Sequence, residues 1–119
     1  HFSLPQLLAL YRISDVGLIS SLHDGMNLVA KEYISSRTDA GGMLVLSQFT
    51  GAAKELTDAI LVNPYDSKEF SEGIYTALTL SEEERKRRML KMRQAIQSAN
   101  IFRWAGKIIS ELLKFEFQE

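Results

Sequence analysis

The chain has 119 residues, enough for one domain with a modest core, and its 14 Lys and Arg residues nearly balance 15 Asp and Glu residues. The net charge of -1 argues against a dedicated nucleic-acid-binding surface, because such surfaces carry an excess of basic residues. With no cysteine, two histidines and no run of about 18 apolar residues, we expect no disulfide, metal site or membrane span, and a cytoplasmic location.

The first half of the chain alternates between helical and strand patterns. In chain order, apolar spacing and turn residues predict a helix ending near Ser14, a strand at 16–20, a helix from Met26 to about Arg37, a strand at 43–47, a short helix around 52–56 and a strand at 59–63. Ser3 before Leu4 and Pro5 supplies the cap and the first-turn proline that start the first helix. Strands separated by helices are typical of parallel crossovers, so we expect an α/β fold with a parallel sheet and right-handed connections.

The chain after residue 66 is predicted to be entirely helical. Apolar stripes and caps predict helices from Lys68 to about Thr79, from Ser81 to about Ser98, and from Asn100 onward. The wide apolar face around Trp104 should lie against the sheet or a neighbouring domain. Glu82, Glu83 and Glu84 each precede a basic residue by four positions, which is typical of a solvated helix face.

A parallel sheet of three strands is small for an independent domain, because both faces need cover and an edge strand stays open. We therefore expect further strands upstream of His1 and interpret the chain as part of a longer protein. If the fragment folds by itself, its open strand edge predicts self-association into a homo-oligomer.

Loops that follow parallel strands emerge at the same edge of a sheet, and open α/β sheets bind their ligands at that edge. The segments 21–27, 48–52 and 63–65 are therefore expected to converge on one crevice. They hold glycines and uncharged polar residues, which allow a ligand to approach the backbone closely and to form hydrogen bonds.

The first of these loops leads into a helix N-terminus that is predicted to bind phosphate or sugar oxygens. Its outward-facing backbone N–H groups would belong to Met26, Asn27, Leu28 and Val29. Asp24 precedes them, and Glu32 lies eight positions later, about 12 Å along the helix. Paired glycosidase carboxylates are roughly 5–9.5 Å apart, so these two acids are interpreted instead as holding points for one elongated ligand, such as a sugar nucleotide. An ordinary turn capped by Asp24, with Gly25 for backbone freedom, fits the pattern equally well.

Three segments of the chain resemble the C-terminal part of the trehalose-6-phosphate synthases, which form glycosyltransferase family 20. They are residues 22–32, 46–53 and 60–65. The first contains the family's Asp-Gly-Met-Asn-Leu-Val-Ala-Lys-Glu element at 24–32 without a gap, and the other two match in residue type and spacing. Gln48 and Thr50 depart from the family, which usually has glutamate and alanine there, and Gln48 lacks the negative charge of that glutamate.

This resemblance implies a two-domain, retaining glucosyltransferase of the GT-B type. Such an enzyme moves glucose from UDP-glucose to glucose 6-phosphate, in the cytoplasm and without a metal or other cofactor. The chain would be the C-terminal part of the donor-binding domain, a three-layer, Rossmann-like half domain of parallel strands followed by C-terminal helices. The N-terminal acceptor domain and the first half of the donor domain would be absent, so the isolated chain is expected to be inactive.

Position by position, the resemblance implies that the Asp24 carboxylate holds glucose hydroxyls, helped by the backbone of residues 25–27. The N–H groups of residues 28 and 29 would meet the distal phosphate, and Glu32 would accept hydrogen bonds from the ribose hydroxyls. The resemblance assigns no catalytic side chain and no metal ligand to this chain.

Two other interpretations stay open at this point. A relative of the same fold could use another acceptor, as a glucosylglycerol-phosphate synthase or a pseudo-glycosyltransferase joining cyclitols does, because acceptor choice lies outside this chain. A catalytically silent regulatory subunit could keep the fold without turnover, and Gln48 is the one sequence feature that points that way. The intact element at 24–32 argues against a silent subunit, which has little need for both donor contacts.

Overall fold

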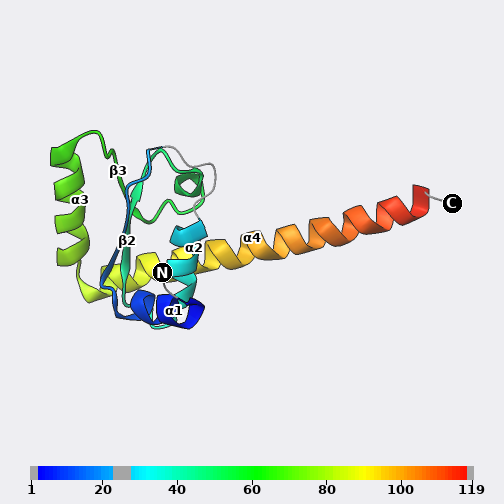
Figure 1. Cartoon of the computed structure of the whole chain (residues 1–119), viewed down its shortest axis with the longest axis horizontal. Coiled ribbons are helices and arrows are strands. Elements are labelled where there is room, and N and C mark those ends of the chain that lie inside the picture. Colours follow the sequence, from blue (N-terminus) through cyan, green and yellow to red (C-terminus); the bar gives the residue numbers. More distant parts are fainter. Residues whose placement is uncertain (1–2, 23–27, 118–119) are drawn as a thin grey trace.

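The computed structural model describes residues 3–22 and 28–117. Figure 1 shows its elements, which in chain order are α1 (Leu4–Ile13), β1 (Val16–Ile19), α2 (Leu28–Ser36), β2 (Met43–Ser47), the 3-10 helix η1 (Gly51–Lys54), β3 (Ile60–Val62), α3 (Ser67–Thr79) and α4 (Glu82–Phe117). The predicted strands and the helices before residue 80 are all present, with ends that differ by one or two residues where they are described.

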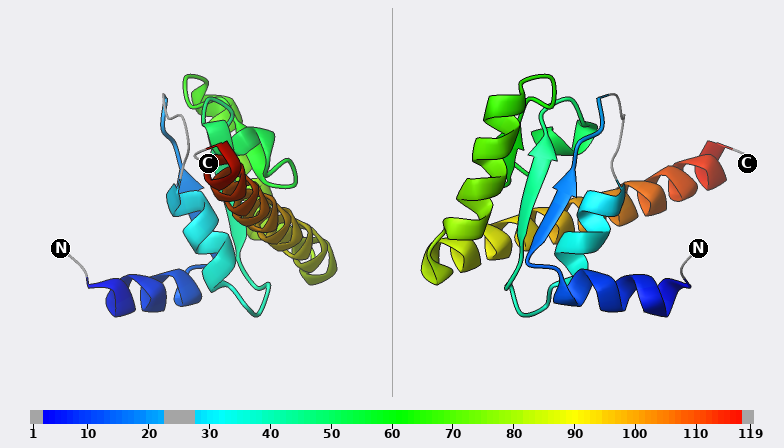
Figure 2. Two further views of the ribbon diagram at one scale, coloured as in Figure 1. Left: turned by 90° about the vertical axis from the view of Figure 1, so that its right-hand side faces the viewer. Right: turned by 60° about the vertical axis from the view of Figure 1, so that its left-hand side comes forward.

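The three strands form one parallel sheet in the order β1-β2-β3, which confirms the predicted α/β fold. Val16 lies opposite Met43, and Leu46 lies opposite Leu61. Every residue of β2 is buried, because this central strand is covered on both faces. The right-hand view in Figure 2 shows β1 and β2 side by side and running in the same direction.

Helices cover both faces of the sheet, as expected for three layers. Helix α3 packs on one face, whereas α2 and the first part of α4 pack on the other, and α1 contacts α2 (Figures 1 and 2). The core contains Met89 and Met92 of α4 together with the apolar residues of β2. In β1, Gly17 allows the ring of Tyr33 to approach, since a Cβ atom there would lie 2.9 Å from Tyr33 Cδ1.

Side-chain caps start both α1, where the sequence predicts one, and α3. The Ser3 side chain accepts from the backbone N–H of Gln6, and the Gln6 side chain accepts from the Ser3 N–H, which completes a capping box at α1. Asp66 caps α3 by accepting from the backbone of Lys68 and Glu69. These caps satisfy N–H groups that have no partner inside the helix, and therefore set each helix start.

The prediction of two separate helices after Ser81 is wrong, because α4 is one continuous helix of 36 residues. This stretch contains no proline and a single glycine, Gly106, so nothing in its backbone requires a break at Asn100. The second half of α4 extends away from the α/β body (Figure 1), and the longest dimension of the chain is 60 Å. The backbone around Trp104 therefore does not lie against this sheet, while the side chain of Trp104 is outside the described part.

The interpretation of the start of α4 as a solvated face is only partly correct, because several arginines there bind the α/β body. Of the three predicted pairs four residues apart, the one present is Glu84 with Arg88, at 2.9 Å. Arg88 also donates to the carbonyl of Asp58 at 3.0 Å. Arg93 donates to two carbonyls in the last turn of α2, at 2.9 and 2.8 Å. These hydrogen bonds hold the first part of α4 against one face of the α/β body. Those of Arg93 also place a positive charge at the C-terminal end of α2, where the helix dipole is negative.

A pH-dependent contribution to stability follows from Glu84. Hydrogen bonds from Arg87 and Arg88 hold the pKa of the Glu84 carboxyl at about 2, below its usual 4.5. The pKa of Glu84 is lower in the folded chain than in the unfolded chain, so its hydrogen bonds stabilise the folded state above about pH 4.5. This contribution is lost as the pH falls toward 2. We expect Glu84→Gln to lower the melting temperature slightly at about pH 6, with a difference from wild type that shrinks toward about pH 3. A difference that stays constant over this range in thermal unfolding would contradict the assignment.

Candidate functional site

The described parts of the three loops meet at the carboxyl edge of the sheet, as predicted. Phe49 and Tyr65 follow β2 and β3, and their rings contact edge to face with centroids 5.6 Å apart. The Gln48 N–H donates to the carbonyl of Val62 at 2.9 Å. A pocket of about 410 Å³ joins the β1 loop to α3, and it is lined by Ser20, Leu22, Pro64, Ser67, Phe70 and Ser71. This edge of the sheet is therefore hollowed, and its pocket has a mainly apolar lining that includes three serines.

Helix α2 begins at the same edge. Its first two residues, Leu28 and Val29, are 58% and 50% exposed, so they lie at the surface and not in the core. This agrees with an N-terminus that is open to a ligand. The predicted site residues Asp24, Gly25, Met26 and Asn27 lie outside the described residues, and their roles stay predictions.

Glu32 lies one turn after Leu28 on the same face of α2 and is exposed. Its Oε2 atom accepts a hydrogen bond from the hydroxyl of Tyr11, at 3.4 Å. Burial and the Glu32 carboxylate raise the pKa of Tyr11 above its ordinary value. The Tyr11 ring in turn contacts that of Tyr33 edge to face, with centroids 6.0 Å apart. Sequence reasoning missed Tyr11, because it is 21 residues away from Glu32 and belongs to a different helix.

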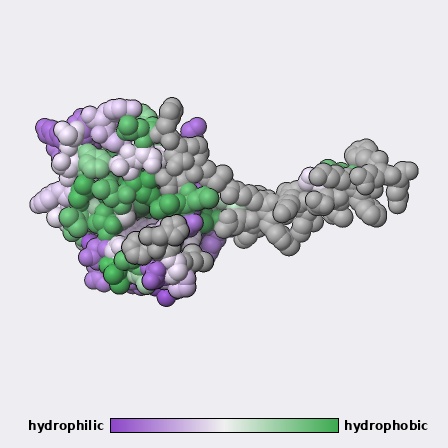
Figure 3. Space-filling model, viewed as in Figure 1, coloured by the Kyte–Doolittle hydropathy of each residue, from purple (hydrophilic) through white to green (hydrophobic). Residues whose placement is uncertain are grey.

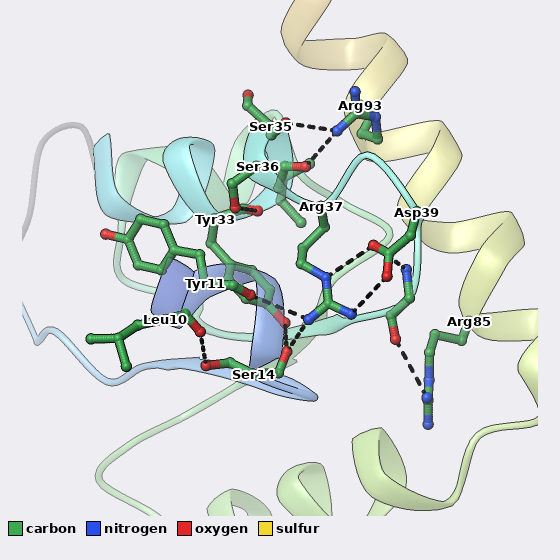
Figure 4. Close-up of polar contacts among 12 residues, drawn as sticks. Leu10, Tyr11, Ser14, Tyr33, Ser35, Ser36, Arg37, Asp39, Arg85 and Arg93 are labelled. Atoms are coloured by element: carbon green, nitrogen blue, oxygen red, sulfur yellow. Dashed lines mark hydrogen bonds and ion pairs between the residues drawn. The ribbon is translucent and has the colours of Figure 1, made fainter. Parts of the chain in front are cut away.

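Arg37 links the ends of α1 and α2 (Figure 4), a role that no sequence pattern indicated. It is only 5% exposed and donates to both carboxylate oxygens of Asp39, at 3.1 and 3.3 Å. Its Nη1 atom also donates to the carbonyls of Tyr11 and Ser14. The Tyr33 hydroxyl donates to the same Ser14 carbonyl at 2.7 Å. The Arg37 hydrogen bonds lower the pKa of Asp39, so this carboxylate stays charged as the partner of the arginine.

The two departures from the family pattern have different surroundings. Gln48 is exposed beside the crevice. Thr50 is only 3% exposed, and its hydroxyl donates to the carbonyl of Ser47 at 2.9 Å. The hydroxyl that distinguishes Thr50 from alanine is thus hydrogen-bonded inside the fold.

Two further classes of site were sought in residues 3–22 and 28–117. Within these ranges, no group of three or more His, Asp or Glu residues is arranged to hold a metal ion. Among the same residues, no helix combines the length and the hydrophobicity that a bilayer span requires.

Comparison with known proteins places this chain in a family. The model of Glycosyltransferase family 20 matches residues 1–114. The trehalose-6-phosphate synthase of Mycobacterium ulcerans (strain Agy99) is 50% identical over 107 residues, which are 90% of this chain and 21% of that protein. The chain therefore spans about a fifth of the length of the curated relatives it matches.

Solved structures are similar over almost the whole chain. One is described as trehalose-6-phosphate from E. coli bound with UDP-2-fluoro glucose, with a TM-score of 0.86, 49% identity and coverage of 94% of this chain and 25% of that one. Another is an alpha,alpha-trehalose-phosphate synthase (UDP-forming) from Burkholderia xenovorans in complex with glucose-6-phosphate, with a TM-score of 0.86, 38% identity and coverage of 95% and 25%. These matches confirm the expected half-domain fold and the resemblance carried by residues 22–32, 46–53 and 60–65.

Proposed function

The chain belongs to glycosyltransferase family 20, and we propose that it is the C-terminal part of the donor-binding domain of a retaining glucosyltransferase. The parent protein would transfer glucose from UDP-glucose to glucose 6-phosphate, forming trehalose 6-phosphate and UDP in the cytoplasm. The names of its relatives support this reaction, as do neighbours bound to a UDP-glucose analogue and to glucose-6-phosphate. The observation that carries the proposal is the unbroken element at 24–32, which leads into α2 at the ligand-binding edge of a parallel sheet.

The donor would lie along the start of α2. The Asp24 carboxylate and the backbone of residues 25–27 would hold the glucose hydroxyls, while the N–H groups of Leu28 and Val29 would bind the distal phosphate. Glu32 would accept hydrogen bonds from the ribose hydroxyls, at an exposed position one turn further along the helix. As the bond between glucose and UDP breaks, negative charge grows on the phosphate, and the positive end of the helix dipole stabilises it. We infer that this helix and basic side chains elsewhere in the parent protein replace a divalent cation.

The rest of the parent protein would supply the acceptor domain and the first half of the donor domain. The open edge of the sheet supports this, because within residues 3–22 and 28–117 β1 has a strand on one side only, and its Leu18 is 47% exposed. Figure 3 shows apolar side chains gathered over the α/β body. An additional strand beside β1 would cover part of this surface. Without the rest of the donor domain, the chain by itself would bind UDP-glucose weakly at most and would not turn it over.

Assays of the full-length parent protein test the proposal. Release of UDP from UDP-glucose is expected only when glucose 6-phosphate is present, together with formation of trehalose 6-phosphate. Turnover with glycerol 3-phosphate or a cyclitol phosphate in place of glucose 6-phosphate would establish the alternative acceptor. Absence of turnover with any of these acceptors, despite binding of UDP-glucose, would overturn the enzymatic assignment in favour of a regulatory subunit.

A further inference from the structure

One charged residue of the element at 24–32 has no role in the donor contacts described above. Lys31 lies between the buried Ala30 and the exposed Glu32, and its side chain is only 13% exposed. Its Nζ atom forms an ion pair with Oε2 of Glu55 at 2.7 Å. Glu55 directly follows η1, the short helix after β2. The pair therefore joins the proposed donor-binding helix to the loop of the neighbouring strand.

Small residues bring these two elements close together. Helix α2 contacts η1, and Ala30, Ala52 and Ala53 are all buried in the core that the two elements share. Side chains of this size allow the two backbones to approach each other but do not interlock, so they restrict sliding or rotation only weakly. A directional contact such as an ion pair fixes the position of α2 along η1, which alanine contacts do not.

The other end of this loop is anchored to the sheet. The N–H of Gln48 bonds to Val62, and both the N–H and the hydroxyl of Thr50 donate to the carbonyl of Ser47. Glu55 itself donates its N–H to the carbonyl of Ala52. These bonds hold the start of the segment 48–55 to β2 and β3 and tie the Glu55 backbone to η1, so Glu55 presents its carboxylate to α2 from an anchored backbone.

Two consecutive side chains of α2 contact neighbouring elements on different sides of the helix. Lys31 binds Glu55 on the side of η1, whereas Glu32 accepts a hydrogen bond from Tyr11 on the side of α1. The Lys31 ammonium is thus already paired, and most of its side chain is covered. This arrangement suits a lysine that orients the helix better than one that binds a phosphate directly.

We propose that Lys31 and Glu55 form a positioning pair that sets α2 against η1. The pair would align the first turn of α2, with the N–H groups of Leu28 and Val29, against the loop at residues 48–50. This inference rests on the proposed function, since it concerns how the same donor site is assembled. Loss of Glu55 leaves the covered Lys31 ammonium unpaired, and loss of Lys31 removes the contact that ties α2 to the more exposed Glu55 carboxylate, so α2 shifts and the donor binds less tightly.

Variants of the full-length parent protein test the pair. Lys31→Met and Glu55→Gln are each expected to raise KM for UDP-glucose and its calorimetric Kd about three- to tenfold, with kcat changed less than about twofold. The double variant should be no worse than either single variant, because the two changes remove one interaction. Lys31→Arg keeps the charge and should restore most of the affinity, whereas Lys54→Met, a matched loss of charge at the exposed last residue of η1, should have no effect.

Different results would overturn the proposal. A large fall in kcat for Lys31→Met combined with unchanged kinetics for Glu55→Gln would show that Lys31 acts on the donor phosphate itself. Additive effects in the double variant would show that the two residues act independently. Wild-type affinity in both single variants, alongside impaired Asp24→Ala and Glu32→Ala proteins, would reject the pair but leave the proposed function intact. The calorimetric readout keeps the test valid for a parent protein without turnover.

Discussion

Replacing Asp24 or Glu32 by alanine in the full-length parent protein is expected to lower kcat/KM for UDP-glucose by about one to two orders of magnitude. Each change removes charge-assisted hydrogen bonds to donor hydroxyls, and such bonds contribute about 1.5–3 kcal/mol apiece. Glu32 is exposed and bonded only weakly to Tyr11, at 3.4 Å, so its loss should leave the melting temperature nearly unchanged. Steady-state kinetics and thermal unfolding together measure both effects.

Inhibition by UDP separates the two acids, because UDP contains the ribose but not the glucose. The inhibition constant for UDP should rise in Glu32→Ala and stay near the wild-type value in Asp24→Ala. Glu83→Ala, which removes an exposed carboxylate on α4, is a matched control that should be unaffected in all assays. Wild-type kinetics in either site variant would reject the role given to that residue.

Replacing Arg37 by methionine should give the largest loss of stability, about 3 kcal/mol, because breaking a buried charged network typically costs 3–5 kcal/mol. The side chain is 5% exposed and donates to carbonyls at the end of α1. Methionine fills similar space but leaves those carbonyls without this donor. The Asp39 side chain is 63% exposed and can be hydrated, which keeps the expected cost at the lower end of the range.

Hydrogen exchange of the α1 and α2 amides measures this effect locally in the full-length protein. Protection of both helices should fall together in Arg37→Met. Arg37→Lys should recover only part of this protection, because one ammonium cannot donate at once to Asp39 and to the carbonyls at the end of α1 as the guanidinium does. Arg12→Met, an exposed charge on α1, is the matched control. Unchanged protection in Arg37→Met would show that the network contributes nothing to the packing of these helices.

Local features of the sequence determined most of the fold. Apolar runs near 16–20, 43–47 and 59–63 specify the strands, and the caps at Ser3 and Asp66 specify helix starts, because both signals act over a few residues. The parallel sheet, and the edge at which the loops after its strands meet, follow from the alternation of strands and helices. The unbroken element at 24–32 identified the family without any coordinates.

The tertiary structure alone decided the contacts between segments far apart in the chain. Tyr11 reaches Glu32, Arg37 bonds to the end of α1, and Lys31 pairs with Glu55, although no local pattern links these positions. The continuity of α4 also needed the structure, since Asn100 is compatible with both a cap and a helix interior. Sequence spacing encodes which face of an element is apolar, whereas the partners of its charged side chains depend on how the elements pack. The elements could therefore be predicted from the sequence, but the polar contacts that hold α2 could not.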